Sequence, residues 1–301
     1  MADKTILVAG GAGQVARALA DAVLPEGLEV VARGRPDLDI LDASAIARTV
    51  DEVRPDFVVN AAAYTAVDQA ESDEAAAFAL NTEAPGHLAA AAAKAGIPII
   101  HLSTDYVFDG GKDAPYVETD PVAPLGVYGR SKLAGEEAVA SANADHIILR
   151  TAWVYSPVGK NFVKTMLRVG AGRDELGVVD DQRGNPTAAA DIAAGIVKIA
   201  TQVLSGAAPV KAGVYHMTST GEATWADFAH YIFECSAELG GPVAEVKRIT
   251  SAEYPTPVRR PANSRLNSSK LAAAYDVELP HWQASTRDCV EQLVITGEWN
   301  S

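Results

Sequence analysis

Short apolar segments alternate with longer amphipathic segments along most of this chain. The short segments are rich in β-branched residues, and strands are predicted at 4–10, 28–33, 56–62, 98–104, 146–152 and 175–181. The spacing of apolar residues between them predicts helices at 13–24, 43–53, 72–95, 126–143, 160–171 and 187–204. Strands that are apolar on both faces indicate a parallel sheet covered by helices on both sides. The pattern therefore predicts an α/β fold of the Rossmann type, with a doubly wound sheet of about six or seven strands and ligands at their carboxyl ends.

The alternation ends near residue 205. Beyond it, "AGVYHMTST" is predicted to form one more strand, and "TWADFAHYIFECSAEL" a helix that Thr224 caps. The segment "YPTPVRRPANSRLNSSKL" is rich in Pro, Ser and Arg and is predicted to be irregular. We therefore expect a first domain at 1–154, joined by part of 175–204, and a smaller α/β lobe formed by 155–174 and 205–301.

Composition and charge narrow the classes of function. The 301 residues carry a net charge of -14, which disfavours nucleic acid and anionic membranes as partners. The two cysteines, Cys235 and Cys289, have no CxxC or histidine spacing around them, so buried, inert thiols are expected rather than zinc ligands or a disulfide. The first residues lack the features of a signal peptide, and no segment approaches the ~20 apolar residues of a membrane span. A cytoplasmic protein is expected.

The first predicted strand leads directly into "GGAGQVA", where Gly10, Gly13 and Ala16 form a GxxGxxA pattern at the start of a helix. Glycines at such a turn let backbone N–H groups approach a pyrophosphate at the helix N-terminus. A plain glycine-rich turn is the alternative, but the strand-turn-helix context favours a dinucleotide. The second strand ends with Arg33, followed by Arg35, where NAD-binding proteins usually have an acidic residue. A guanidinium there suits the 2′-phosphate of NADPH, although a solvated loop arginine is the alternative.

Two further segments follow predicted strands. "NAAAY" at 60–64 offers small side chains against which a flat cofactor could lie, or alternatively tight packing of a helix on the sheet. "LSTDYVFDG" places Ser103, Thr104 and Asp105 at the carboxyl end of the fourth strand. Hydroxyls and a carboxylate at this edge lie where the fold binds its ligand.

Tyr128 and Lys132 are four residues apart on a predicted helix and therefore share one face. A phenol of pKa about 10 is a poor acid or base at neutral pH, and a nearby cation favours its phenolate. In a carbonyl reduction, such a tyrosine gives its proton to the developing alkoxide while a Ser or Thr hydroxyl orients the same oxygen. A single YxxxK pattern is typical of a surface helix. Its occurrence together with the glycine turn and the Ser-Thr pair favours catalysis.

The chain resembles the extended short-chain dehydrogenase/reductases and, within them, the dTDP-4-dehydrorhamnose reductases. The stretches that carry the resemblance are "GGAGQVA", "DLDILD", "PDFVVNAAAYTAVDQAE", "NTEAP", "LSTDYVFDG", "YGRSKLAGE", "RTAWVYSPVGKNFV" and "DDQRGNPT". The resemblance implies reduction of the C4 ketone of dTDP-6-deoxy-L-lyxo-4-hexulose by NAD(P)H, which gives dTDP-L-rhamnose for cell-surface polysaccharide. It also implies that the first domain binds NAD(P) and that the smaller lobe binds substrate.

The resemblance also implies roles for individual residues. Tyr128 is expected to donate the proton, Lys132 to bind the nicotinamide ribose and tune the phenol, Thr104 to assist the tyrosine, and Asp105 to contact the sugar. The expected cofactor contacts are Gly10, Gly11, Ala12, Gly13, Gln14 and Val15 at the pyrophosphate, Asp39 and Ile40 at the adenine, and Ala61, Ala62, Ala63 and Tyr64 in the middle. The expected substrate pocket contains Val67, Trp153 and Asn161.

An anionic substrate in an acidic protein requires local positive charge. Arg259 and Arg260, with Arg265 and Lys160, form a candidate pyrophosphate clamp, the alternative being a solvated loop. NADPH is the favoured cofactor, with NADH as the alternative. Some relatives dimerise through Mg²⁺, but no motif places its ligands here, so metal dependence and the choice between monomer and homodimer stay open.

Two rival functions fit the same scaffold. Nucleotide-sugar dehydratases and epimerases resemble the chain, but a dehydratase has a second carboxylate where Tyr106 follows Asp105. The regulatory subunit of methionine adenosyltransferase is a non-catalytic relative of this subfamily. The intact set of Thr104, Tyr128 and Lys132 favours an enzyme.

Overall fold

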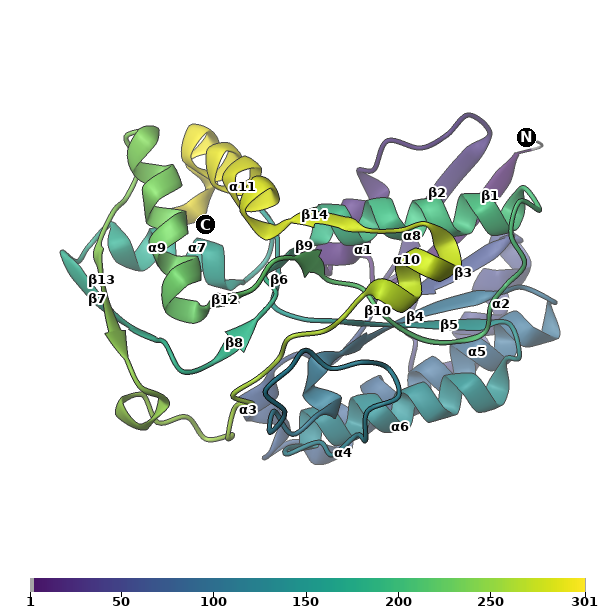
Figure 1. Cartoon of the computed structure of the whole chain (residues 1–301). Coiled ribbons are helices and arrows are strands. Elements are labelled where there is room, and N and C mark those ends of the chain that lie inside the picture. Colours follow the sequence, from purple (N-terminus) through teal and green to yellow (C-terminus); the bar gives the residue numbers. More distant parts are fainter. Residues whose placement is uncertain (1–2, 301) are drawn as a thin grey trace.

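A parallel six-stranded sheet forms the centre of the computed structural model, which describes residues 3–300 (Figure 1). The strand order is β10-β5-β4-β3-β1-β2, and all five neighbouring pairs are parallel. The strands are β1 (Lys4–Ala9), β2 (Leu28–Arg33), β3 (Phe57–Asn60), β4 (Ile99–Thr104), β5 (His146–Thr151) and β10 (Gly213–His216). The order reverses between β1 and β3, which places a ligand-binding crevice at their carboxyl ends.

Helices cover both faces of this sheet, as predicted. α1 (Gln14–Ala20) and α8 (Ala189–Leu204) pack on one face against a cluster that includes Ile6 and Val8. α2 (Ala43–Val53), α5 (Ala84–Lys94) and α6 (Val127–Ala142) lie on the other face, where Leu7 and Val58 join their core (Figure 1). Adjacent residues of β1 thus enter opposite clusters, as expected for a strand buried on both sides.

The helix predicted at 72–95 contains a π-helical turn. It consists of α4 (Glu74–Phe78), the π turn η1 (Ala79–Glu83) and α5. Within this turn, Asn81 accepts a hydrogen bond from Tyr64 N at 2.8 Å and donates to Tyr64 O at 3.2 Å. The helical irregularity thus holds the segment that follows β3 in place.

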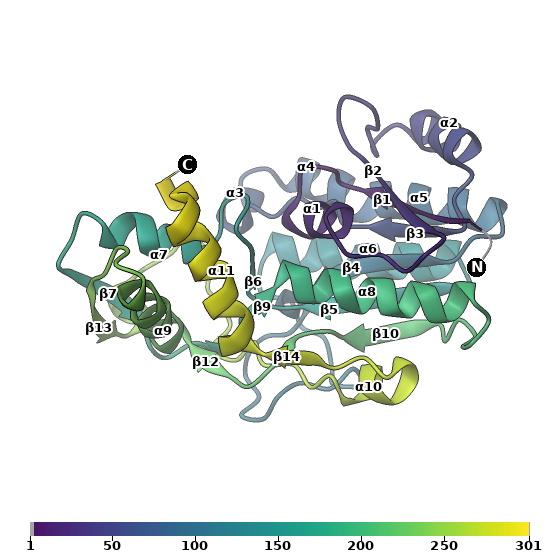
Figure 2. The same cartoon turned by 90° about the horizontal axis from the view of Figure 1, so that it is seen from above.

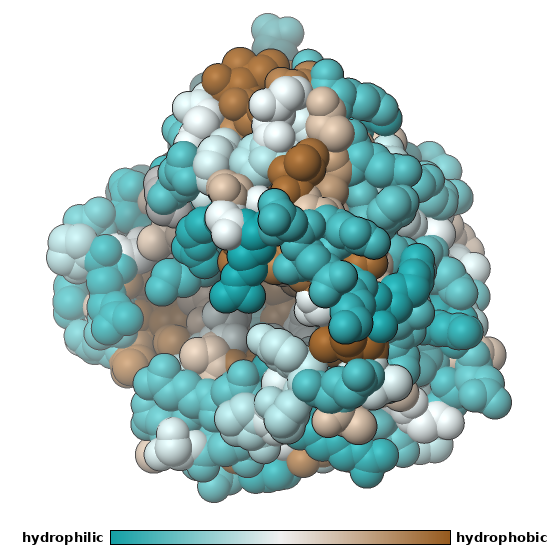
Figure 3. Space-filling view, turned by 90° about the vertical axis from the view of Figure 1, so that its left-hand side faces the viewer, coloured by the Kyte–Doolittle hydropathy of each residue, from teal (hydrophilic) through white to brown (hydrophobic). Residues whose placement is uncertain are grey.

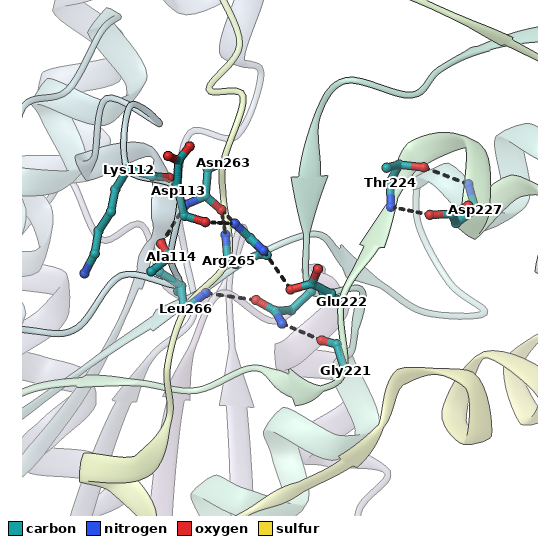
Figure 4. A network of polar contacts seen from close by, with 11 residues as sticks. Lys112, Asp113, Ala114, Gly221, Glu222, Thr224, Asp227, Asn263, Arg265 and Leu266 are labelled. Carbon is teal, nitrogen blue, oxygen red and sulfur yellow. Dashed lines mark hydrogen bonds and ion pairs between the residues drawn. The ribbon is translucent and has the colours of Figure 1, made fainter.

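A second lobe lies at the carboxyl ends of the central strands, opposite the N-terminal end of the chain (Figures 1 and 2). Its core lies among α7 (Phe162–Gly170), α9 (Trp225–Glu238) and α11 (Trp282–Thr296). The predicted Thr224 cap of α9 is confirmed, because Thr224 and Asp227 exchange hydrogen bonds in a capping box (Figure 4). Figure 3 faces this end of the molecule and shows a hollow with apolar residues inside it.

Several further elements are short. They are α3 (Val67–Ala70), η2 (Asp105–Val107), β6 (Val154–Tyr155), β8 (Arg183–Gly184), β9 (Thr187–Ala188), β11 (Ser219–Thr220), β12 (Ala223–Thr224), η3 (Ser251–Glu253), α10 (Ser269–Tyr275), β14 (Leu279–His281) and η4 (Glu298–Asn300).

Two predicted strands exchange places relative to the expectation. The strand predicted at 175–181 exists as β7 (Glu175–Val179), but its predicted place in the central sheet was wrong. β7 pairs with β13 (Glu245–Ile249) in the second lobe. The sixth central strand is β10, from the segment assigned to the smaller lobe, and it pairs with β5. Glu175 and Gly177 of β7 are exposed while Leu176 and Val178 are buried, so β7 has only one covered face. The two regions therefore do not divide at residue 205.

Both cysteines are free and buried, as predicted. Burial raises the pKa of the Cys289 thiol to about 12 and also raises that of Cys235, so neither residue is a thiolate at neutral pH. In residues 3–300, no helix is both long and apolar enough to span a membrane.

Candidate active site

The glycine turn between β1 and α1 brings two segments of backbone into close contact. Gly10 has a φ of +114°, and a Cβ on it would lie 2.7 Å from Ala62 N. Gly13 precedes α1, and no side chain in the described part of the chain caps that helix. The turn therefore leaves the positive end of α1 open to an anion, in contact with the Ala61–Ala62 backbone, and fits a dinucleotide pyrophosphate.

The residues expected near the adenine lie along β2 and the loop after it. Arg33 is aligned with Ala9 of β1, is partly exposed, and its guanidinium donates to Ala32 O at 3.2 Å. Asp39 accepts a hydrogen bond from Leu41 N, and Ile40 is buried in the core. Arg33 borders the turn, because its carbonyl accepts hydrogen bonds from Gly10 N and Gly11 N. The side chain of Asp39 bonds within its own loop, and that of Ile40 has a packing role.

Thr104, Asp105 and Tyr128 converge at the carboxyl end of β4. Thr104 Oγ1 donates to Asp105 Oδ1 at 3.0 Å, and a hydrogen bond with Thr104 lowers the pKa of Tyr128. Burial outweighs this effect and raises the pKa of Tyr128, as does the charge of Asp105. Burial also raises the pKa of Asp105 to about 6, although hydrogen bonds from the hydroxyls of Ser264 and Thr104 act to lower it. Tyr128 is therefore a protonated phenol at neutral pH and can serve as a proton donor.

Lys132 lies one turn along α6 from Tyr128 and is almost completely buried. Its Nζ donates to Leu102 O at 2.7 Å and lies 3.4 Å from His101 Nε2. Burial lowers the pKa of Lys132 to about 8, while Glu136 acts in the opposite direction. Lys132 Nζ is thus held from the β4 side of the site.

Arg260 connects an irregular segment to the site, a contact that sequence reasoning did not predict. Its guanidinium donates to Tyr106 Oη at 3.0 Å and to Asp68 Oδ2 at 2.6 Å. The Tyr106 ring contacts the Tyr128 ring edge to face, with centroids 5.4 Å apart. The sequence showed an RR pair, but Asp68 lies 192 positions away, so no local pattern could have revealed the pairing.

The predicted four-residue clamp does not assemble. Arg265 is buried, and its guanidinium bonds to Asn263, Glu222 and the Asp113 carbonyl (Figure 4). Arg259 is exposed and lines, with Arg260, a cavity of about 380 Å³ that also contains Asp109, Gln182 and Tyr254. Lys160 is exposed and does not line this cavity. Of the four clamp residues, only Arg259 and Arg260 line this cavity.

The residues expected in the substrate pocket lie in three separate segments of the chain. Val67 begins α3 and is partly exposed. Trp153 has a φ of +49° and stacks on Trp225, with centroids 3.5 Å apart. Asn161 caps α7, and its Nδ2 donates to Gln14 Oε1 at 3.1 Å. Gln14 therefore ties the nucleotide turn to the second lobe, and Asn161 is already committed to that contact.

A model of the family described as the RmlD substrate binding domain matches residues 4–295. The chain belongs to this family. The chain is 50% identical over 293 residues to a dTDP-4-dehydrorhamnose reductase of Sinorhizobium fredii, covering 97% of this chain and 99% of the relative. It is 42% identical over 300 residues to the enzyme of that name from Escherichia coli K12, covering 97% and 98%. Membership of the dTDP-4-dehydrorhamnose reductases, predicted from the motifs, is confirmed.

Solved structures of the RmlD family agree in fold. That of a dTDP-4-dehydrorhamnose reductase from Bacillus anthracis, in complex with NADP, aligns with a TM-score of 0.88 and 32% identity, over 97% of this chain and all of the other. The ortholog from Clostridium acetobutylicum aligns with a TM-score of 0.86 and 37% identity, over 96% and 99%. The predicted Rossmann-type fold is confirmed.

Proposed function

We propose that this protein reduces the C4 ketone of dTDP-4-dehydro-6-deoxy-L-mannose (dTDP-6-deoxy-L-lyxo-4-hexulose) with NADPH and forms dTDP-L-rhamnose, the last step of dTDP-rhamnose synthesis. The observation that carries the proposal is the convergence of Thr104 and Tyr128 at the crevice beside the glycine turn. The chain is similar along nearly its whole length to proteins named for this activity, so a nucleotide-sugar oxidoreductase is the function that both observations support.

Different residues of the chain are assigned to cofactor binding, proton donation and orientation of the substrate. Gly10 to Val15, with Ala61 to Tyr64, would hold the cofactor, which supplies hydride when bound. Tyr128 holds its proton at neutral pH because burial raises its pKa, and it gives this proton to the oxygen of the reduced carbonyl. Thr104 orients the same oxygen by a hydrogen bond. Asp105, beside Thr104, is placed to accept a hydrogen bond from the sugar.

Several finer assignments belong to the same proposal. Arg33 supports NADPH over NADH, because its guanidinium lies at the end of β2, where a 2′-phosphate would be bound. In residues 3–300 there is no group of three or more metal-ligating side chains that could hold an ion, which gives no support to a resident Mg²⁺. We expect residues 1–154 to bind the cofactor and the lobe that contains α7, α9 and α11 to bind the sugar nucleotide. The choice between monomer and homodimer, and a cytoplasmic location, stay predictions.

The alternative functions lack particular groups. A dehydratase needs a second carboxylate after Asp105, and that position is occupied by Tyr106, whose hydroxyl is bonded to Arg260. An epimerase would retain NAD⁺ through each turnover, so purification with stoichiometric NAD⁺ and no consumption of NADPH would favour that class. A regulatory subunit would not require Tyr128 to hold a proton beside Thr104.

The test is oxidation of NADPH with the dTDP keto sugar, compared with its UDP and GDP counterparts. Tyr128→Phe is expected to bind NADPH normally and to lose about 10²-fold or more in turnover, the contribution of a positioned acid. Tyr231→Phe, in α9, is the matched control and should keep wild-type turnover. Unchanged turnover in Tyr128→Phe would refute the assigned proton donor.

A further inference from the structure

A buried histidine that has no part in the proposed reaction lies next to Lys132. His101, in β4, has its Nε2 3.4 Å from Lys132 Nζ and its Nδ1 3.0 Å from Asn60 Nδ2. His101 and Asn60 are completely buried, and Lys132 is 2% exposed. Polar groups in such a place must satisfy one another, so the direction of each hydrogen bond can be worked out.

The backbone after β3 determines which way the Asn60 amide points. Ala62 N donates to Asn60 Oδ1 at 3.1 Å, so the oxygen faces Ala62 and the NH₂ group faces His101. An NH₂ group can only donate, so His101 Nδ1 accepts and carries no proton. Burial holds the pKa of His101 well below its usual range, so the ring is neutral. Its single proton is therefore on Nε2, which faces Lys132.

This tautomer affects the charge of Lys132. An ammonium group has three donors and no acceptor, so it cannot accept the His101 Nε2–H, whereas a neutral amine can. The amine also keeps a donor for Leu102 O, at 2.7 Å. Glu136, one turn along α6, favours the ammonium, but its carboxylate is bonded to Arg150 at 2.9 and 2.7 Å and to Ser103 at 2.5 Å.

We propose that Asn60 and His101 are positioning residues that control the protonation of Lys132: Asn60 fixes the tautomer of His101, and His101 presents its Nε2–H to Lys132 and favours the neutral amine. The titratable and charged groups facing Lys132 are Tyr128 and Glu136 on α6, His101 on β4, and Arg150 on β5, behind Glu136. The backbone that fixes Asn60 is the Ala61–Ala62 segment, so the hydrogen-bonded chain that starts at Lys132 ends on backbone that packs against the glycine turn.

The first test needs neither cofactor nor activity. In ¹⁵N-labelled, cofactor-free protein, correlation spectra of the imidazole rings identify which nitrogen carries the proton. His216 is an internal reference, since its Nδ1 lies 3.2 Å from Tyr116 O and must donate to that carbonyl. We expect opposite tautomers in the two buried rings, Nε2–H in His101 and Nδ1–H in His216. A proton on Nδ1 of His101, or a charged ring at pH 7, overturns the proposal.

The second test reverses the tautomer with the isosteric variant Asn60→Asp. A carboxylate accepts from both Ala62 N and His101 Nδ1–H, so Nε2 loses its proton and becomes an acceptor for the ammonium. The pKa of Lys132, followed in ¹³C-labelled lysine and assigned by its absence from Lys132→Arg, should rise by about one unit or more. Because the part of the inference that concerns turnover rests on the proposed function, the basic limb of the kcat/KM profile should move upward by the same amount.

A matched control separates this effect from the general effect of a new buried charge. Asn143 is also buried, bonds to the Ile97 carbonyl and Asp145 N, and caps the C-terminal end of α6, about 16 Å along the helix axis from Lys132. Asn143→Asp should leave the His101 tautomer and the Lys132 titration unchanged. An unreversed tautomer in Asn60→Asp, or a reversed tautomer with an unmoved Lys132 titration, overturns the proposal.

If Asn60→Asp does not fold, the wild-type protein still decides the question. Nε2–H in His101 together with a Lys132 titration near pH 8 supports the proposal, whereas a titration at about 10 or above, the ordinary range for lysine, overturns it. Failure of the reduction assay with the expected tautomer present would refute the proposed substrate and leave this hydrogen-bonded chain intact.

Discussion

Asp105 is a carboxylate that destabilises the folded protein, and its replacement by asparagine is expected to stabilise it. Asp105 is 3% exposed, and its pKa is raised from 3.8 to about 6, mainly by burial. At about 1.4 kcal/mol for each pKa unit, the ionised form costs about 3 kcal/mol above pH 6. An asparagine amide removes this cost. Its NH₂ group, however, replaces an oxygen that accepts a hydrogen bond, and the loss of that bond destabilises the protein by about 1 kcal/mol. Asp105→Asn should therefore gain about 2 kcal/mol at pH 7.5.

The sign of the pH dependence distinguishes this cause from others. A carboxyl with a raised folded-state pKa binds its proton more tightly in the folded state, so stability increases as pH falls through about 6 towards 3.8. The advantage of Asp105→Asn should shrink to about 1 kcal/mol at pH 5.5, still above the isoelectric point near 4.8. Urea unfolding of cofactor-free protein at pH 5.5, 6.5 and 7.5 measures this difference.

Asp109 is a control of opposite sign in the same loop. It is exposed, and its pKa is lowered, chiefly by the hydrogen bond from Gly111 N and also by the Tyr116 hydroxyl. Asp109→Asn should destabilise the protein at neutral pH, and the loss should diminish as pH falls. The reasoning is refuted if Asp105→Asn is less stable than wild type at pH 7.5, or if its advantage grows towards acid pH. The rate of keto-sugar reduction should fall in Asp105→Asn even though the protein becomes more stable, because residues at functional sites are often unfavourable for stability.

Three further perturbations test other parts of the molecule. Glu136→Gln leaves the Arg150 charge buried without its partner and should cost about 3–5 kcal/mol in urea unfolding, whereas the double variant with Arg150→Met should recover most of this loss. Gly10→Ala places a methyl group against the backbone after β3 at a φ of +114°, so NADPH fluorescence titration should show binding abolished while the sheet remains folded by circular dichroism. The double variant Arg259→Ala, Arg260→Ala should raise KM for the sugar nucleotide and leave KM for NADPH unchanged. If its KM for the sugar nucleotide equals that of the wild type, the two-arginine clamp is excluded.

The local sequence pattern was sufficient to predict those elements that can be recognised from residues close together in the chain. Apolar strands followed by a GGAGQVA turn define β1 and α1 because the glycine turn needs no distant partner to be recognised. Helix α6 was predicted within one residue at each end, and Tyr128 and Lys132 share its inner face because the helical repeat alone determines that relation. Thr104 follows from the same logic, since parallel strands end at one edge of the sheet.

What the sequence determined by itself was therefore the order of elements, the glycine turn proposed to bind the cofactor and the candidates for the reacting groups, all of which depend on neighbours close in the chain. Tertiary structure decided the rest: that β10 rather than β7 completes the central sheet, that Arg265 is committed to Glu222, and that Arg260 reaches Asp68. It also decided the charge of Lys132, because burial and the direction of the His101 hydrogen bond arise only when β3, β4 and α6 pack together. Pairing between distant segments and the desolvation of charge depend on which surfaces meet, and periodicity along a chain does not encode that.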